Sequence, residues 1–153
     1  MKILARHLTA DLFNCQNSQL TDNELIKDML TSLLQNFGLR LIRMNMEAIS
    51  DGHTVCMVIL NQGHISLHIY PELKYVSLDI FLCQENAEPD KLGQIVRNYF
   101  KPDKTKTTVL KRGDFGNAKE LKPKVKTKVA PLRKIHNTGA KVIRILARRN
   151  NKQ

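Results

Sequence analysis

Three short runs of β-branched and apolar residues follow one another in the middle of the chain, and this succession constrains the fold more than any other feature. They cover residues 54–60, 64–70 and 75–82. The breaks between them, residues 61–63 and 71–74, are short and contain the turn-forming residues Asn, Gly and Pro. Links of this length and composition are typical of β-hairpins, whose strands pair antiparallel. The segment therefore predicts three consecutive antiparallel strands.

A long helix is predicted before these strands. Residues Thr21 to Glu24 match a capping box, in which a hydroxyl residue is followed three positions later by glutamate. Gly38 stands where such a helix would end. Seven apolar residues recur between them at helical spacing: Leu25, Ile26, Met29, Leu30, Leu33, Leu34 and Phe37.

Four further elements complete the prediction. Residues 4–13 and 39–49 are expected to be strands, with a turn at Asp51–Gly52. Residues 88–100 predict a second helix that Pro102 closes, and residues 106–110 predict a last strand. The apolar face of the second helix consists of Leu92, Ile95, Val96 and Tyr99.

The pattern as a whole predicts an α+β fold: one antiparallel-rich sheet with two helices packed on one of its faces. Leu30, Leu33, Leu34 and Phe37 are expected to face the sheet on the side opposite His64, Ser66 and His68, because each element must bury one face.

The net charge of +11 belongs to one end of the sequence. Residues 1–115 hold 13 Lys/Arg and 13 Asp/Glu, whereas residues 116–153 hold 12 Lys/Arg and one acid, Glu120. We therefore divide the chain into a neutral domain, 1–115, and a basic tail, 116–153. Mutual repulsion predicts an extended or mobile tail. Such a tail favours nucleic acid or an anionic membrane surface as partner, and the alternative is a solvated, solubilising extension.

Composition excludes several classes of protein. No run approaches the roughly 20 apolar residues of a membrane span, and the start of the chain does not read as a signal peptide. Three scattered cysteines, Cys15, Cys56 and Cys83, form neither a disulfide framework nor a zinc pattern. These features favour a cytoplasmic protein.

The densest group of polar residues lies in and after the second of the three central runs. His64, Ser66 and His68 have the period-2 spacing that places side chains on one face of a strand. They are either the outer face of a half-exposed strand or part of a site. Cys83 at the end of the next run has the same ambiguity, because a free cysteine is more often a small buried residue than a reactive thiol.

Three sequence blocks carry a resemblance to a known family. They are Arg6-His7-Leu8 with Asp11 and Cys15, then His64 through Tyr70 with Pro71-Glu72, then Asp79 through Cys83. In order and spacing they resemble the bacterial and archaeal S-adenosylmethionine decarboxylases of spermidine synthesis. The resemblance covers about residues 1–113.

The resemblance implies a self-processing enzyme. Members of the family cleave a Glu-Ser bond just before the position of His64, and the serine becomes a pyruvoyl group that serves as electron sink for decarboxylation. It further implies a processing role for His68, a proton-donor role for Cys83 and a place for Glu72 in the substrate pocket. We add His64 and His7 as candidate ligand-binding residues. The family also implies a homodimer in which two sheets form a larger sandwich, with the sites at the junction.

This sequence departs from the family where processing takes place. The Glu-Ser pair is Gln62-Gly63, and glycine has no oxygen with which to attack the preceding carbonyl. The assisting serine corresponds to Val55, the aromatic residue that stacks on adenine to Ile49, and the histidine two positions earlier to Glu47. We therefore expect no pyruvoyl group and no bound metal.

Three hypotheses follow for the function. The first is a catalytically inactive homologue that regulates or pairs with an active enzyme, or binds S-adenosylmethionine or a polyamine-pathway metabolite. The second is an active decarboxylase that uses a different route, which would require a carbonyl electron sink from elsewhere. The third is a polyanion-binding protein that acts through its tail.

Overall fold

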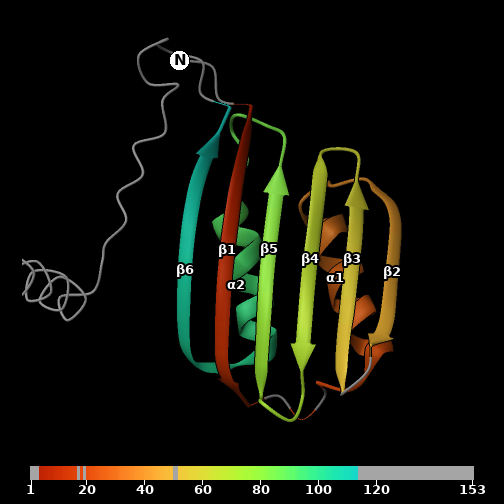
Figure 1. Cartoon of the computed structure of the whole chain (residues 1–153). Helices are drawn as coiled ribbons and strands as arrows, with labels where there is room; N and C mark the ends of the chain where they lie inside the picture. The colour runs from red at the N-terminus through yellow and green to blue at the C-terminus, as the bar shows by residue number, and fades with distance from the viewer. Residues whose placement is uncertain (1–3, 17, 19, 50–51, 114–153) are drawn as a thin grey trace, which may run out of the picture. The chain divides into compact units, whose positions relative to one another are not determined.

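The computed structural model describes residues 4–16, 18, 20–49 and 52–113. It contains six strands, β1 (Ala5–Cys15), β2 (Leu41–Ile49), β3 (His53–Leu60), β4 (Gly63–Tyr70), β5 (Tyr75–Leu82) and β6 (Pro102–Arg112). Two helices, α1 (Asn23–Asn36) and α2 (Pro89–Phe100), lie between β1 and β2 and between β5 and β6 (Figure 1). The predictions for the basic tail fall outside the described residues.

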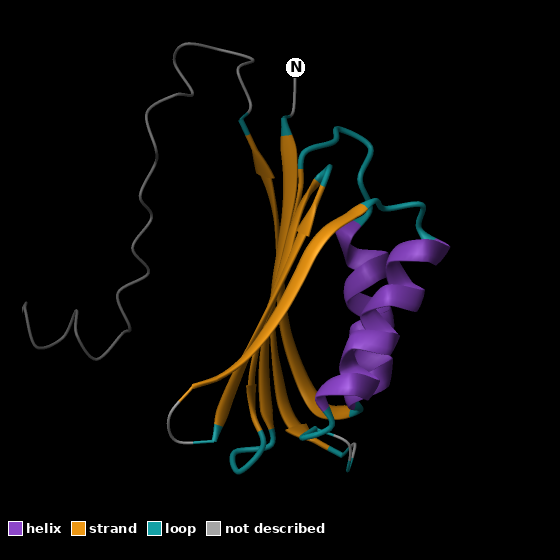
Figure 2. Ribbon diagram, turned by 90° about the vertical axis from the view of Figure 1, so that its right-hand side faces the viewer, coloured by secondary structure: helices purple, strands orange, loops and turns teal. Residues whose placement is uncertain are grey.

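The strands form one six-stranded sheet in the order β2-β3-β4-β5-β1-β6. Every neighbouring pair is antiparallel. The predicted meander is therefore present as β3-β4-β5, and β1 lies between β5 and the edge strand β6. Both helices cover the same face of the sheet, as expected, and no described element covers the other face (Figure 2). We call this second face the open face.

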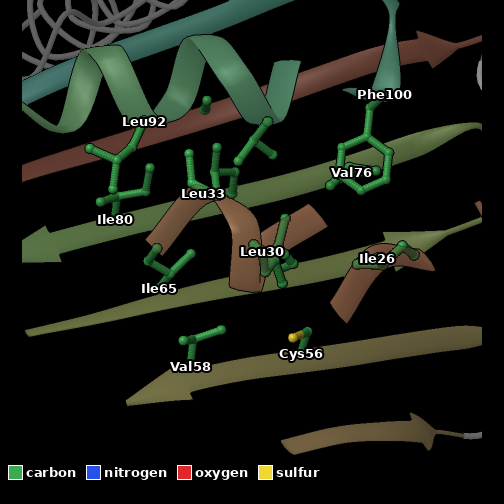
Figure 3. Close-up of a cluster of buried hydrophobic side chains, with 14 of the residues drawn as sticks. Ile26, Leu30, Leu33, Cys56, Val58, Ile65, Val76, Ile80, Leu92 and Phe100 are labelled. Carbon is green, nitrogen blue, oxygen red and sulfur yellow. The ribbon is translucent and has the colours of Figure 1, made fainter. Parts of the chain in front are cut away.

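The space between the helices and the sheet is the hydrophobic core (Figure 3). Helix α1 contributes Ile26, Leu30, Leu33 and Leu34, each at most 2% exposed. The alternate residues of β4 and β5, among them Ile65 and Ile80, meet them from the sheet. No charged or polar side chain of the described residues is buried. The polar side chains of β4 and β5 lie on the open face, because the alternate residues of these strands are the buried ones.

The start of α1 differs from the prediction by one residue. Asp22, not Thr21, caps the helix, and its side chain accepts a hydrogen bond from the backbone N–H of Leu25 at 3.1 Å. Glu24 instead pairs with Lys27 at 2.8 Å within the first turn. The predicted end is confirmed, because Gly38 follows the helix with a φ of +61° that favours glycine.

The last strand is six residues longer than predicted. Lys101 ends α2 in the left-handed conformation, and Pro102, predicted only to close the helix, is already the first residue of β6. The strand then continues to Arg112, pairing with β1 along its length. Its repeated lysines and threonines gave no apolar alternation, because an edge strand of this composition buries little on either face.

None of the helices in the described part of the chain is long and apolar enough to cross a membrane.

We predict that Leu33→Ala lowers the free energy of unfolding by about 2–5 kcal/mol, because it leaves a cavity between α1 and the sheet. The neighbouring Ser32 is exposed, so Ser32→Ala should change stability by less than about 0.5 kcal/mol. Urea unfolding of both variants checks the assignment of the helix face. Equal effects of the two substitutions would contradict it.

The cysteines provide a second prediction. Burial raises the pKa of the Cys15 and Cys56 thiols to about 11, whereas Cys83 is exposed. Because the thiolate is the nucleophile, only Cys83 should react quickly with Ellman's reagent in the native protein at mildly alkaline pH. Cys15 and Cys56 should react after unfolding in denaturant, and Cys83→Ser should abolish the fast reaction. Rapid labelling of a second thiol would show that the core is open.

Candidate functional site

The open face carries four histidines, His7, His53, His64 and His68, from strands β1, β3 and β4. Along β4 the odd-numbered residues from Ile65 onward are buried under the helices, and the even-numbered ones are half-buried on the other side. The predicted common face of His64, Ser66 and His68 is confirmed. Ring contacts and hydrogen bonds join the four histidines into two separate groups.

The first group surrounds Phe81 and is called the Phe81 cluster: His7, His64, Asp79, Phe81 and Arg112. The Phe81 ring lies between the rings of His64 and His7, with centroid distances of 5.3 and 5.5 Å. Arg112 lies 5.9 Å from the centre of the same ring. The cluster joins β4, β5, β1 and β6 across the sheet.

Two polar contacts of His7 connect Arg112 to Asp79 in the Phe81 cluster. Arg112 donates from Nη1 to Nδ1 of His7 at 3.3 Å, because a guanidinium group can only donate. Nε2 of the same ring lies 3.3 Å from Oδ1 of Asp79. His7 thus links the Arg112 guanidinium to the Asp79 carboxylate.

The second group is called the His68 cluster: His53, His68, Tyr70 and Glu72. Nε2 of His53 lies 3.0 Å from Nδ1 of His68, so the two rings are joined by a hydrogen bond in which one nitrogen donates and the other accepts. The His53 ring stacks on Tyr70 at a centroid distance of 4.2 Å. Glu72, in the turn after β4, approaches the residue before His53: a Cβ built on Gly52 would lie 3.9 Å from its Oε1.

The positions that depart from the family border the His68 cluster. Glu47 pairs with Val55 across β2 and β3, and Val55 pairs with His68 across β3 and β4. Ile49 pairs with His53 and is 48% exposed. His68 therefore has an apolar neighbour on the β3 side, where the family resemblance implies a hydroxyl group.

Gly63 occupies a position where the backbone excludes a side chain. Its φ is +148°, and a Cβ built on it would lie 1.9 Å from the carbonyl oxygen of Phe81. The backbone N–H of Cys83 donates to the carbonyl oxygen of Gln62 at 2.6 Å. The fold thus brings Cys83 beside the Gln62–Gly63 bond, while the neighbouring strand β5 leaves no room for a side chain at residue 63.

The candidate residues do not form one pocket within the chain. His7, His64 and Cys83 lie towards the Gly63 end of β4, whereas His68 and Glu72 lie towards its other end. Four residues of strand separate His64 from His68, or about 13 Å. A cavity of about 150 Å³ lies under α2, against the helix-facing side of β1 and β6, and another of about 360 Å³ lies beside Cys15 and Pro71. None of the five candidate residues lines either cavity.

Several residues of the two clusters escaped prediction from the sequence. Tyr70 continues the alternation of His64, Ser66 and His68, so the period-2 pattern could have identified it. His53 and Arg112 become members only through strand pairing, which the sequence pattern does not specify. The ambiguity at Cys83 is resolved in favour of an exposed thiol. No group of three or more potential metal ligands occurs in the described ranges.

Comparison with known proteins supports the resemblance. The sequence profile of the S-adenosylmethionine decarboxylase family matches residues 6–113. The S-adenosylmethionine decarboxylase proenzyme of Methanococcus maripaludis is 33% identical over 122 residues, which cover 78% of this chain and all of the relative. The proenzyme of Caldicellulosiruptor saccharolyticus is 28% identical over 115 residues, or 75% of this chain and 93% of the relative.

The same fold occurs in a solved structure. The crystal structure of the adenosylmethionine decarboxylase from Aquifex aeolicus VF5 superposes with a TM-score of 0.65 and 21% sequence identity. The match covers 74% of this chain and 93% of the Aquifex chain. The profile match spans more than half of the sequence, and the Methanococcus relative aligns over its full length. This chain belongs to the S-adenosylmethionine decarboxylase family.

Proposed function

We propose that this protein is a non-processing member of its family, without decarboxylase activity, that binds S-adenosylmethionine or a related polyamine-pathway metabolite and acts as a regulator or partner. The observation that carries the proposal is Gly63. Formation of a pyruvoyl group requires a hydroxyl side chain at the cleavage position, and this residue has no side chain.

The surroundings of Gly63 support the same conclusion. A side chain there would collide with the Phe81 carbonyl at 1.9 Å, and the φ of +148° is one that residues other than glycine rarely adopt. The chain therefore does not fit the pyruvoyl group of its relatives. Val55, which pairs with His68 across β3 and β4, also supports the absence of processing, because it offers no hydroxyl to assist an acyl shift.

The division of the candidate residues supports a site made by two copies of the chain. The Phe81 and His68 clusters lie on the same open face but at different ends of it. A second sheet packed on this face in the opposite direction would bring the Phe81 cluster of one copy towards the His68 cluster of the other. The partner would be a second copy or an active homologue with the same face.

The metabolite would be bound by polar contacts and ring stacking. Glu72 offers a carboxylate for a sulfonium or ammonium group, and the stacked rings of His53 and Tyr70 offer a surface for an adenine ring. Ile49, at the position of the family's stacking residue, provides only apolar contact. Recognition would therefore depend on the His68 cluster more than on Ile49.

A second candidate function is decarboxylation by a different route. Family membership favours it, because the relatives reported above are named decarboxylase proenzymes, and His68 and Cys83 are both retained. Release of CO₂ from S-adenosylmethionine by the purified chain, with no added carbonyl compound, would favour this candidate over the first.

We predict that the purified protein remains one intact polypeptide, because residue 63 lacks the nucleophile. Denaturing mass spectrometry checks this directly. Fragments 1–62 and 63–153, the second starting with a modified residue, would disprove the proposal.

Gly63→Ser should also fail to process, and it should lose stability by roughly 1–3 kcal/mol because of the left-handed backbone and the contact with Phe81. Ser66→Gly is the control on the same strand. It exchanges serine and glycine at a position that does not face the Phe81 carbonyl. Efficient cleavage of Gly63→Ser would show that the site retains its processing machinery.

Metabolite binding is tested separately by calorimetric titration with S-adenosylmethionine and with its decarboxylated product. We expect saturable binding that Glu72→Gln weakens, with Glu24→Gln on α1 as a control of equal charge change. Absence of heat with both compounds would disprove the metabolite-binding role while leaving the prediction on processing intact.

A further inference from the structure

The charge of the chain changes sign where β6 begins, not where the domain ends. Residues 1–100 hold 8 Lys/Arg and 11 Asp/Glu, whereas residues 101–153 hold 17 Lys/Arg and 3 Asp/Glu. The zero net charge of residues 1–115 is therefore the sum of an acidic part, residues 1–100, and a basic part that begins at Lys101. Lys101 and β6 together carry five cations and one acid, Asp103.

These cations are accessible and have no carboxylate partner. Among the described strands, β6 is an edge strand that pairs with β1 alone (Figure 1). Nearly all of its residues are exposed. Among the described residues, no carboxylate oxygen lies within 4.0 Å of a β6 lysine or of Arg112. Arg112 donates instead to Nδ1 of His7.

The nearest carboxylates are held by uncharged donors. Asp103 accepts hydrogen bonds from Asn14 and, at 3.3 Å, from Gln16. Asp11, which pairs across the strands with Lys106, accepts the hydroxyl of Tyr75 at 2.6 Å, and this hydrogen bond raises the pKa of Tyr75. Neither carboxylate forms an ion pair with a β6 cation in the described part of the chain, and the strand keeps an excess of cations over acids.

Protection of a sheet edge does not account for this concentration. Lysines on an edge strand do prevent pairing with another sheet. The opposite edge, β2, needs the same protection, yet it carries only Arg43 and Glu47 and exposes Leu41, Ile42 and Ile49. The difference between the two edges indicates that β6 has a further role.

We propose that β6 binds the phosphate backbone of a nucleic acid. The cations lie along a strand of 11 residues, or about 36 Å of length, which suits a linear polyanion. Thr107 and Thr108 are exposed and add hydroxyl groups, which contact phosphates in many complexes. Arg112 belongs both to this surface and to the Phe81 cluster, whereas Lys104 and Lys106 lie outside the two clusters of the proposed metabolite site.

The distribution of charge around the strand favours nucleic acid over a membrane surface. Lys104, Lys106 and Arg112 have the register of the open face, whereas Lys111 has the opposite register. A flat membrane would contact one of these sets, whereas a flexible strand of nucleic acid can follow the edge and contact both.

The test compares two double variants of the full chain, which keep the tail and lose equal charge. Lys104→Gln/Lys106→Gln removes two cations from β6, and Lys27→Gln/Lys91→Gln removes two from the helices. Binding to a fluorescein-labelled oligouridylate is measured by anisotropy over a range of salt. We expect the β6 variant to bind about tenfold more weakly at low salt and to lose about 1.4 from the slope of log K against log salt.

The control variant should keep the slope of the unmodified chain, and Lys104→Arg/Lys106→Arg should restore it. Equal losses in both double variants would overturn the proposal, because net charge alone would then explain binding. So would the absence of RNA binding by the unmodified chain at low salt. A β6 effect that is confined to vesicles of phosphatidylcholine and phosphatidylserine would likewise overturn it.

Discussion

The packing of two amphipathic helices against one face of the sheet is the interaction on which the rest of the structure depends. Leu30 and Leu33 of α1 and Val96 of α2 are at most 1% exposed, and they meet the alternate apolar residues of β4 and β5. Because side chains alternate across a strand, burying one set commits the other set to the opposite face. A register shift of one residue would bury His64 and His68 without hydrogen-bonding partners, at a cost that a core of this size could not offset.

This constraint assembles the histidine clusters on the open face. His7 and Phe81 belong to strands that are distant in sequence but adjacent in the sheet, and their rings meet only because β1 lies beside β5. The same antiparallel registers bring His53 to Tyr70 and His68. A face with two polar and aromatic clusters, which neither described helix covers, is suited to contact with a ligand or with a second sheet.

Gly63 illustrates how closely a family's chemistry depends on local backbone geometry. The hairpin between β3 and β4 places the Gln62 carbonyl against the N–H of Cys83 and brings residue 63 under the Phe81 carbonyl. The family resemblance implies a serine at this position for processing. Here the missing hydroxyl is accompanied by a backbone geometry that favours glycine and leaves no room for a side chain.

The sequence by itself determined the elements and their amphipathic faces. The apolar spacing of α1, the end of this helix at Gly38 and the strands of the meander were all predictable, because helix and strand periodicities depend on local residue order. It also determined the family through the blocks around His64 and Cys83. Only the tertiary structure decided that these residues form two clusters, that Gly63 has no room for a side chain and that β6 extends to Pro102. Each of these depends on strand order and register, which are set by contacts between residues far apart in the sequence.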